Sequence, residues 1–177
     1  KALSNGQQPS PQSILCLASY KALHEYEWCN HLAVTPEIEE VFTRQVREPE
    51  QEIRLKSHIP ALQDITDKVS AKVREQYEES PYPKWINLEL AFKPDSISRI
   101  VDEAKLRLFD KAINEVEAPN VLIAGCGTGQ HSIETASRFE NSKVLAIDLS
   151  LSSLVYAKRM TEELDVQNID YMQADIL

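Results

Sequence analysis

The sequence predicts an α/β fold: a parallel sheet near the carboxyl end of the chain, preceded by an α-helical region. Three of the four glycines lie within five residues, inside residues 121–131, and an apolar stretch rich in β-branched residues leads into them. A helical pattern follows, with Ile133, Ala136 and Phe139 spaced three apart. Strand, glycine turn and helix, in this order, let a ligand approach bare backbone at a helix N-terminus. These observations indicate a nucleotide-type site.

A second apolar run, residues 144–147, ends at Asp148, nineteen residues after the last glycine. An acidic residue at the end of the second strand, about twenty residues past the glycines, is placed to accept hydrogen bonds from a ribose diol. Hydrogen bonds to charged groups contribute roughly 1.5–3 kcal/mol each. Ser150 is typical of a helix N-cap. A third strand is expected over residues 169–174, and it also ends at an acid, Asp175.

The spacing of the glycines limits the class of nucleotide ligand that is expected. They stand at Gly125, Gly127 and Gly129, whereas the dinucleotide fingerprint G-x-G-x-x-G wants its third glycine or alanine where this chain has Gln130. We expect Gln130 to crowd the contact between helix and strand, which argues against a nicotinamide dinucleotide. An oxidoreductase that uses such a cofactor is the lesser alternative.

At these residues the sequence resembles the class I S-adenosylmethionine-dependent methyltransferases. The family's glycine loop matches residues 125–129, and its ribose acid falls on Asp148. The family packs an apolar side chain on the adenine at the next position, and many members bond the adenine amino group with the acid after the third strand. Many members also carry an acid where this chain has Ile123. The resemblance implies a Rossmann-like sheet, S-adenosyl-L-methionine as the cofactor, and cofactor binding by Gly125, Cys126, Gly127, Gly129, Asp148, Leu149, Asp175 and Ile176.

A finer resemblance lies in residues 73–85, which are similar to a segment of bacterial methyltransferases that follow tetratricopeptide repeats. Its last nine residues hold two prolines and three aromatics, so the segment is expected to be stiff and extended. Tyr77, Tyr82 and Trp85 then form either a lid over the cofactor or part of an ordinary linker whose aromatics dock on the core.

Apolar residues at helical spacing predict helices upstream of the sheet. Such stripes are usually packing faces. The predicted helices cover residues 12–28, begin again at Thr35-Pro36 and at Pro49, include a stripe of Ile65, Val69 and Val73, and run from Pro94 to Leu108. The predicted domains are a helical region over residues 1–92, with a connector at 77–85, and the first half of a Rossmann-like domain over residues 93–177, truncated after the third strand.

Composition excludes several classes of function. The net charge of −9 is spread evenly and forms no basic stripe, which argues against a nucleic-acid ligand. No run approaches the ~18 apolar residues of a membrane span. The three cysteines form no C-x-x-C pair, which favours a reducing, cytoplasmic location. His24, Cys29 and His31 match no zinc spacing, so we expect no metal.

The resemblance implies a sheet of seven strands, and this chain stops just past the third. We therefore expect a fragment of a longer enzyme, inactive alone, that self-associates through an unpaired sheet edge. The predicted function is S-adenosylmethionine-dependent methyl transfer to an unidentified acceptor, a small molecule or a protein. This chain would carry the cofactor-binding half, and no catalytic residue can be named. The alternative is a non-catalytic protein-interaction module with a vestigial or regulatory adenosyl-ligand pocket.

Overall fold

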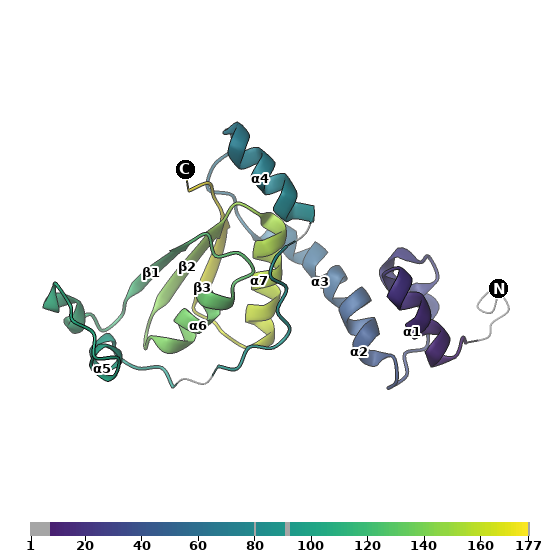
Figure 1. Cartoon of the computed structure of the whole chain (residues 1–177), viewed down its shortest axis with the longest axis horizontal. Coiled ribbons are helices and arrows are strands. Elements are labelled where there is room, and N and C mark those ends of the chain that lie inside the picture. The colour runs from purple at the N-terminus through teal and green to yellow at the C-terminus, as the bar shows by residue number, and fades with distance from the viewer. Residues whose placement is uncertain (1–7, 80, 91–92, 177) are drawn as a thin grey trace. The chain divides into compact units, whose positions relative to one another are not determined.

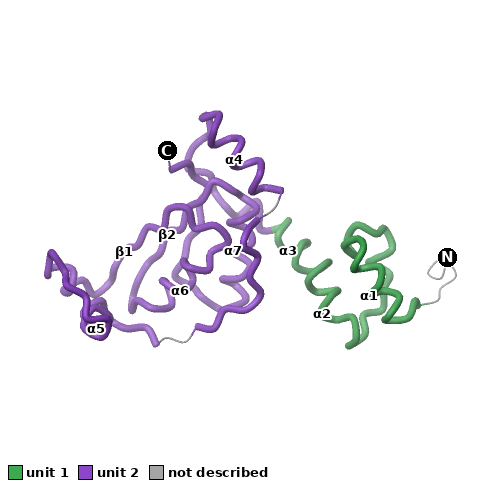
Figure 2. Tube along the Cα trace, viewed as in Figure 1, with its two compact units in different colours: residues 1–54 green, residues 55–177 purple. Residues whose placement is uncertain are grey.

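The computed structural model describes residues 8–79, 81–90 and 93–176. The chain divides into two compact units, residues 1–54 and residues 55–177 (Figure 2). None of the described helices is both long and apolar enough to cross a bilayer.

The first unit is helical. α1 (Pro11–Tyr20) begins after Ser10, whose hydroxyl accepts a hydrogen bond from the N–H of Ser13. Two 3₁₀ turns follow, Leu23–Glu25 and Cys29–His31. The apolar core of the first unit consists of Ile14, Ala18, Leu23, Cys29, Leu32, Ile38, Phe42 and Val46.

A second helical segment in this region runs without a break through α2 (Glu39–Phe42), a π-helical turn (Thr43–Arg47) and α3 (Glu48–Leu55). Pro49 is the second residue of α3, so the short helix that the sequence predicts to start at Pro49 begins one residue earlier and follows the π-helical turn directly. A proline has no N–H, so the carbonyl of Gln45 loses its usual helical partner. His24 Nδ1 lies 2.7 Å from that carbonyl oxygen and supplies the missing hydrogen bond.

The second unit contains a three-stranded parallel sheet of order β1-β2-β3 (Figure 1). Its strands are β1 (Asn120–Ala124), β2 (Lys143–Asp148) and β3 (Ile169–Gln173), joined by α6 (Gln130–Arg138) and α7 (Leu151–Glu163). The predicted α/β fold with a Rossmann-like parallel sheet is confirmed.

Both connecting helices cover the same face of the sheet, because right-handed crossovers that progress in one direction place their helices on one side. Val144 and Ala146 are buried on that face, whereas Leu122 is exposed on the other. Among the described strands, β1 pairs only with β2. Self-association through the free edge of β1 stays a prediction.

The segment after residue 54 packs on this sheet unit. It continues through a 3₁₀ turn (Lys56–His58) and α4 (Lys68–Glu79). Leu55 and Ile59 belong to the core beneath α7. The N–H of Leu62 donates to the carbonyl of Gln173 at 2.9 Å. The compact units therefore divide at 54/55, and the domain boundary at 92/93 stays a prediction from the sequence.

The approach to β1 is less helical than the sequence suggests. α5 (Ile97–Glu103) ends well before Leu108, and Lys105 has a positive φ of 52°. A 3₁₀ turn (Lys111–Glu115) then leads into β1. A left-handed residue stops a helix, and lysine at that position gives no sequence signal of the stop.

Candidate functional site

The carboxyl ends of the strands open into a cavity of about 420 Å³. In parallel α/β sheets this edge is where ligands bind. The loops after β1, β2 and β3 line the cavity together with α4. The lining residues are Gly125, Gly127, Asp148, Leu149, Ser153, Ala174, Asp175 and Ile176 from the sheet side, and Val69, Ser70, Val73, Tyr77 and Tyr82 from α4 and the connector.

Two of the three clustered glycines present open backbone to this cavity. Gly125 has a φ of 74° and Gly127 a φ of 53°, and a Cβ added at either would meet no atom within 4 Å. The N–H groups of Gly125 and Cys126 both donate to the carbonyl of Ile147, at 2.8 and 3.0 Å. The loop is therefore held on β2 with its glycine backbone facing free space.

The third glycine packs against a neighbouring helix. Gly129 has a φ of 85°, and its Cβ would lie 2.5 Å from Cβ of Ala157 in α7. It is buried and does not line the cavity. Gln130 is exposed, so the expected crowding at that residue does not occur. Close packing between helices falls on Gly129 instead.

Asp148 holds the loops of the site together. Its Oδ2 accepts a hydrogen bond from the N–H of Gly127 at 2.8 Å, and its Oδ1 accepts one from the N–H of Ser150 at 2.9 Å. Each carboxylate oxygen can accept a further bond. The backbone of Leu149 is fixed in turn, because its carbonyl accepts from Nε2 of Gln173 at 2.9 Å. Asp148 can therefore brace the glycine loop and bind a hydroxyl-bearing ligand at once.

Cys126 does not line the cavity, although it lies between two glycines that do. Burial, and then the charge of Asp148, raise the pKa of its thiol to about 12. A thiol with such a pKa stays protonated at neutral pH and is a poor nucleophile. Cofactor binding by Cys126 stays a prediction.

The aromatic connector is tied to the glycine loop. Nε1 of Trp85 donates to the carbonyl of Thr128 at 3.1 Å, and Oγ1 of Thr128 donates to the carbonyl of Pro83 at 2.6 Å. Tyr156 donates its hydroxyl hydrogen to the carbonyl of Trp85. Trp85 is buried and lies outside the cavity lining, whereas Tyr77 and Tyr82 line it. Of the three aromatics, Trp85 docks on the core.

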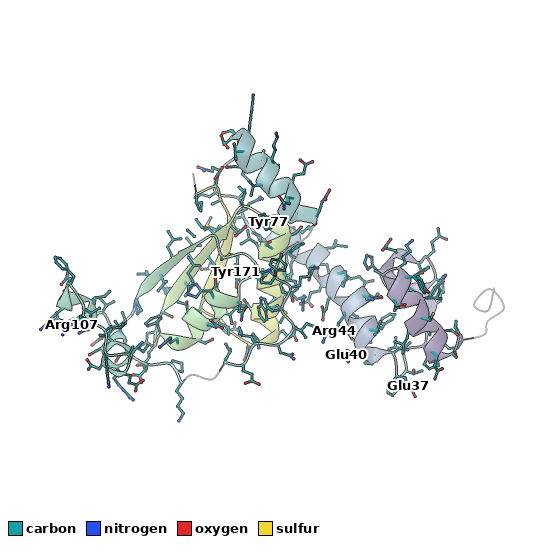
Figure 3. The ribbon with its side chains drawn as sticks, in the orientation of Figure 1. Glu37, Glu40, Arg44, Tyr77, Arg107 and Tyr171 are labelled. Atoms are coloured by element: carbon teal, nitrogen blue, oxygen red, sulfur yellow. The ribbon has the colours of Figure 1, made fainter. Side chains whose placement is uncertain are left out.

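Helix α4 is fastened to the start of α7. The Glu78 carboxylate accepts from the N–H groups of Leu151 and Ser152, at 2.6 and 3.1 Å, and from Oγ of Ser152 at 2.6 Å. Ser150 Oγ donates to the carbonyl of Tyr77 at 3.2 Å. A carboxylate at the N-terminus of a helix is favoured by the helix dipole. Figure 3 shows Tyr77 where α4 meets α7.

The position of α4 at the cavity could not be predicted from the sequence. Val69 and Val73 were expected on a packing face, but both are exposed and line the cavity, so that prediction is wrong. Glu78 was missed because it caps a helix 73 residues away, and no local pattern marks such a pair.

The electrostatic character of the cavity is acidic. Asp148 and Asp175 line it, and no lysine, arginine or histidine stands among its described lining residues. Within residues 8–79, 81–90 and 93–176, no group of three or more His, Cys, Asp or Glu side chains is arranged to hold a metal ion.

The sheet unit is similar to known proteins. Residues 121–177 match a family model described as a methyltransferase domain. The chain is 30% identical over 89 residues to a tRNA (guanine-N(7)-)-methyltransferase of Helicobacter pylori strain J99, covering 50% of this chain and 22% of that protein. It is 30% identical over 88 residues to an (S)-coclaurine N-methyltransferase of Thalictrum flavum subsp. glaucum, covering 48% and 24%. The chain thus spans less than a quarter of these relatives.

Among solved structures, a coclaurine N-methyltransferase bound to N-methylheliamine and SAH is 18% identical, with a TM-score of 0.38 and coverage of 95% of this chain and 47% of that one. A SAM-dependent methyltransferase from Aquifex aeolicus is 28% identical, with a TM-score of 0.30 and 48% coverage of each chain. The family match and the relatives support the resemblance at the level of a methyltransferase domain. The tetratricopeptide-associated subfamily stays a prediction.

Proposed function

We propose that this chain binds S-adenosyl-L-methionine at the carboxyl edge of its sheet and supplies the cofactor-binding half of a methyl-transfer site. One observation carries the proposal: the open backbone of Gly125 and Gly127 lines the same cavity as the strand-end acid Asp148. Leu149 and Ile176 line it too and would enclose the adenine. Asp148 would accept the ribose hydroxyls, and Asp175 would bond the adenine amino group.

The charge of the cavity supports this ligand over a dinucleotide. S-adenosylmethionine carries a sulfonium cation and an ammonium group, whereas a dinucleotide carries an anionic pyrophosphate. Asp148 and Asp175 attract the first and repel the second, and no cationic side chain is among the described lining residues. The charge of the cavity, and not crowding at Gln130, therefore disfavours a dinucleotide.

The cofactor would supply a methyl group that is displaced from its sulfonium by an acceptor atom. In such a reaction the protein mainly aligns the two reactants and tunes the local electrostatics. The residues of this chain would hold the cofactor in one orientation, through the glycine loop at one end and Asp148 at the ribose. The acceptor is a small molecule or a protein, and we assign no catalytic base.

Calorimetric titration with S-adenosylhomocysteine tests the proposal. Ile176 and Leu106 make a matched pair, because they are 60% and 59% exposed and only Ile176 lines the cavity. Ile176→Ser is expected to weaken binding about tenfold through lost apolar burial, and Leu106→Ser should leave it unchanged. NADH, as the control ligand, should give no heat. Equal affinity of both variants, or no binding by the folded wild-type chain, would contradict the proposal.

A further inference from the structure

Helix α4 presents an apolar stripe to the cavity. Val69, Val73 and Tyr77 follow one another at four-residue spacing, so they share one side of the helix. All three line the cavity, and all three are exposed. A helix normally turns its apolar stripe toward a core. Here the stripe faces the same space as Leu149 and Ile176, the two side chains expected to enclose the adenine.

A second feature of α4 points to a ligand. Ser70 is 2% exposed and lines the cavity. Its Oγ makes no hydrogen bond of good geometry among the described residues, although the hydroxyl is close enough to the Asp67 carboxylate to help lower the pKa of Asp67. A buried hydroxyl without a partner is unfavourable, and such groups are rare in native proteins. A polar ligand in the cavity would supply the partner once the Ser70 side chain turns toward it.

Little in α4 itself explains why the helix stays at this edge. Of its twelve residues only Ser70 is buried. Among the described residues, the hydrogen bonds that join it to the N-terminus of α7 are those made by Glu78 and by the carbonyl of Tyr77. Hydrogen bonds to a charged carboxylate are about twice as strong as neutral ones. The position of the apolar stripe therefore depends on Glu78.

We propose that α4 is a wall of the adenosyl site: its Val69, Val73 and Tyr77 side packs on the bound adenosyl group, and Glu78 is the positioning residue that keeps the helix there. This inference rests on the proposed function. The bound group would cover the apolar surface that α4 now exposes, between the stripe on one side and the strand-end loops on the other.

Two matched pairs of variants test the wall. Val73 and Val116 are both 40% exposed, and only Val73 lines the cavity. Glu75 and Glu78 both belong to α4, and only Glu78 caps α7. Affinities for S-adenosylhomocysteine and for adenosine are measured by calorimetry on the full chain, with the midpoint of thermal unfolding recorded for each variant.

Val73→Ser is expected to weaken both ligands by the same factor, about fivefold, with an unchanged unfolding midpoint, and Val116→Ser should leave both affinities as they are. Glu78→Ala should weaken both ligands about tenfold, and Glu75→Ala less than twofold. Glu78→Gln, which keeps one acceptor oxygen, should recover part of the loss.

The inference is overturned if Val73→Ser binds like the wild-type chain while Ile176→Ser loses affinity, a result that leaves the proposed function standing. A wild-type chain that binds neither ligand overturns both. A lower unfolding midpoint in Glu78→Ala with unchanged affinity would give Glu78 a structural role alone and also contradict the inference.

Discussion

The loop between β1 and α6 uses glycine in two different ways on its two sides: open space on one and close packing on the other. On one side Gly125 and Gly127 have free space where a side chain would be, and they border the cavity. On the other side Gly129 packs against α7, and the carbonyl of Thr128 accepts a hydrogen bond from Nε1 of Trp85. All three glycines have a positive φ. Backbone conformation alone therefore does not separate the glycines that admit a ligand from the one that admits a neighbouring helix.

The largest effect is expected at Gly129. Gly129→Ala places a Cβ 2.5 Å from Cβ of Ala157 and forces alanine to a φ of 85°. Overpacking against a helix and left-handed strain together should reduce the free energy of unfolding by about 3 kcal/mol. Urea denaturation followed by circular dichroism measures this loss. A loss no larger than that of Gly127→Ala would refute the division between the two sides.

Gly127→Ala should lose little stability but much of its affinity for the ligand. Its Cβ meets nothing within 4 Å, so only the strain of a positive φ remains, at about 1 kcal/mol. The same Cβ would occupy space that the ligand needs, and we expect the affinity for S-adenosylhomocysteine to fall tenfold or more. Titration of the folded variant measures this. Wild-type affinity in Gly127→Ala would mean that the ligand does not approach this backbone.

The smallest effect concerns Cys126, which lies between the two sides. The pKa of its thiol is raised to about 12, so the neutral form persists at every pH below that value. The thiolate fraction at pH 8 is then on the order of one in ten thousand. Iodoacetamide at pH 8 should modify the exposed Cys16 and leave Cys126 unmodified. Mass spectrometry of the peptides measures both rates of modification. A rate at Cys126 comparable to that at Cys16 would contradict the prediction.

The features that could be predicted from the sequence are those with a local cause. Gly125, Gly127 and Asp148 belong to a strand–turn–helix–strand pattern whose spacing is fixed by the fold, and they meet at one cavity as expected. Ser150 caps α7 as predicted, because its hydroxyl accepts the N–H of Ser153. Short-range backbone chemistry determines each of these.

The features that escaped prediction depend on contacts between distant parts of the chain. Pro49 predicts the start of a helix but not the helical turn that leads into it, in which His24 satisfies the carbonyl that the proline leaves free. Val73 was predicted to lie on a packing face, yet it lines the cavity, and α4 is joined to α7 by the Glu78 carboxylate. Neither partner can be found from the spacing of residues within one element.

Backbone amide shifts in the ¹⁵N-labelled chain, recorded with and without S-adenosylhomocysteine, show directly whether the ligand binds at the carboxyl edge of the sheet. We expect the largest shifts at Gly125, Gly127, Leu149 and Ile176, and no shifts in the core of the helical unit around Val46. Saturable shifts confined to residues outside the cavity, or no shifts from a folded chain at millimolar ligand, would rule out an adenosyl site at this edge.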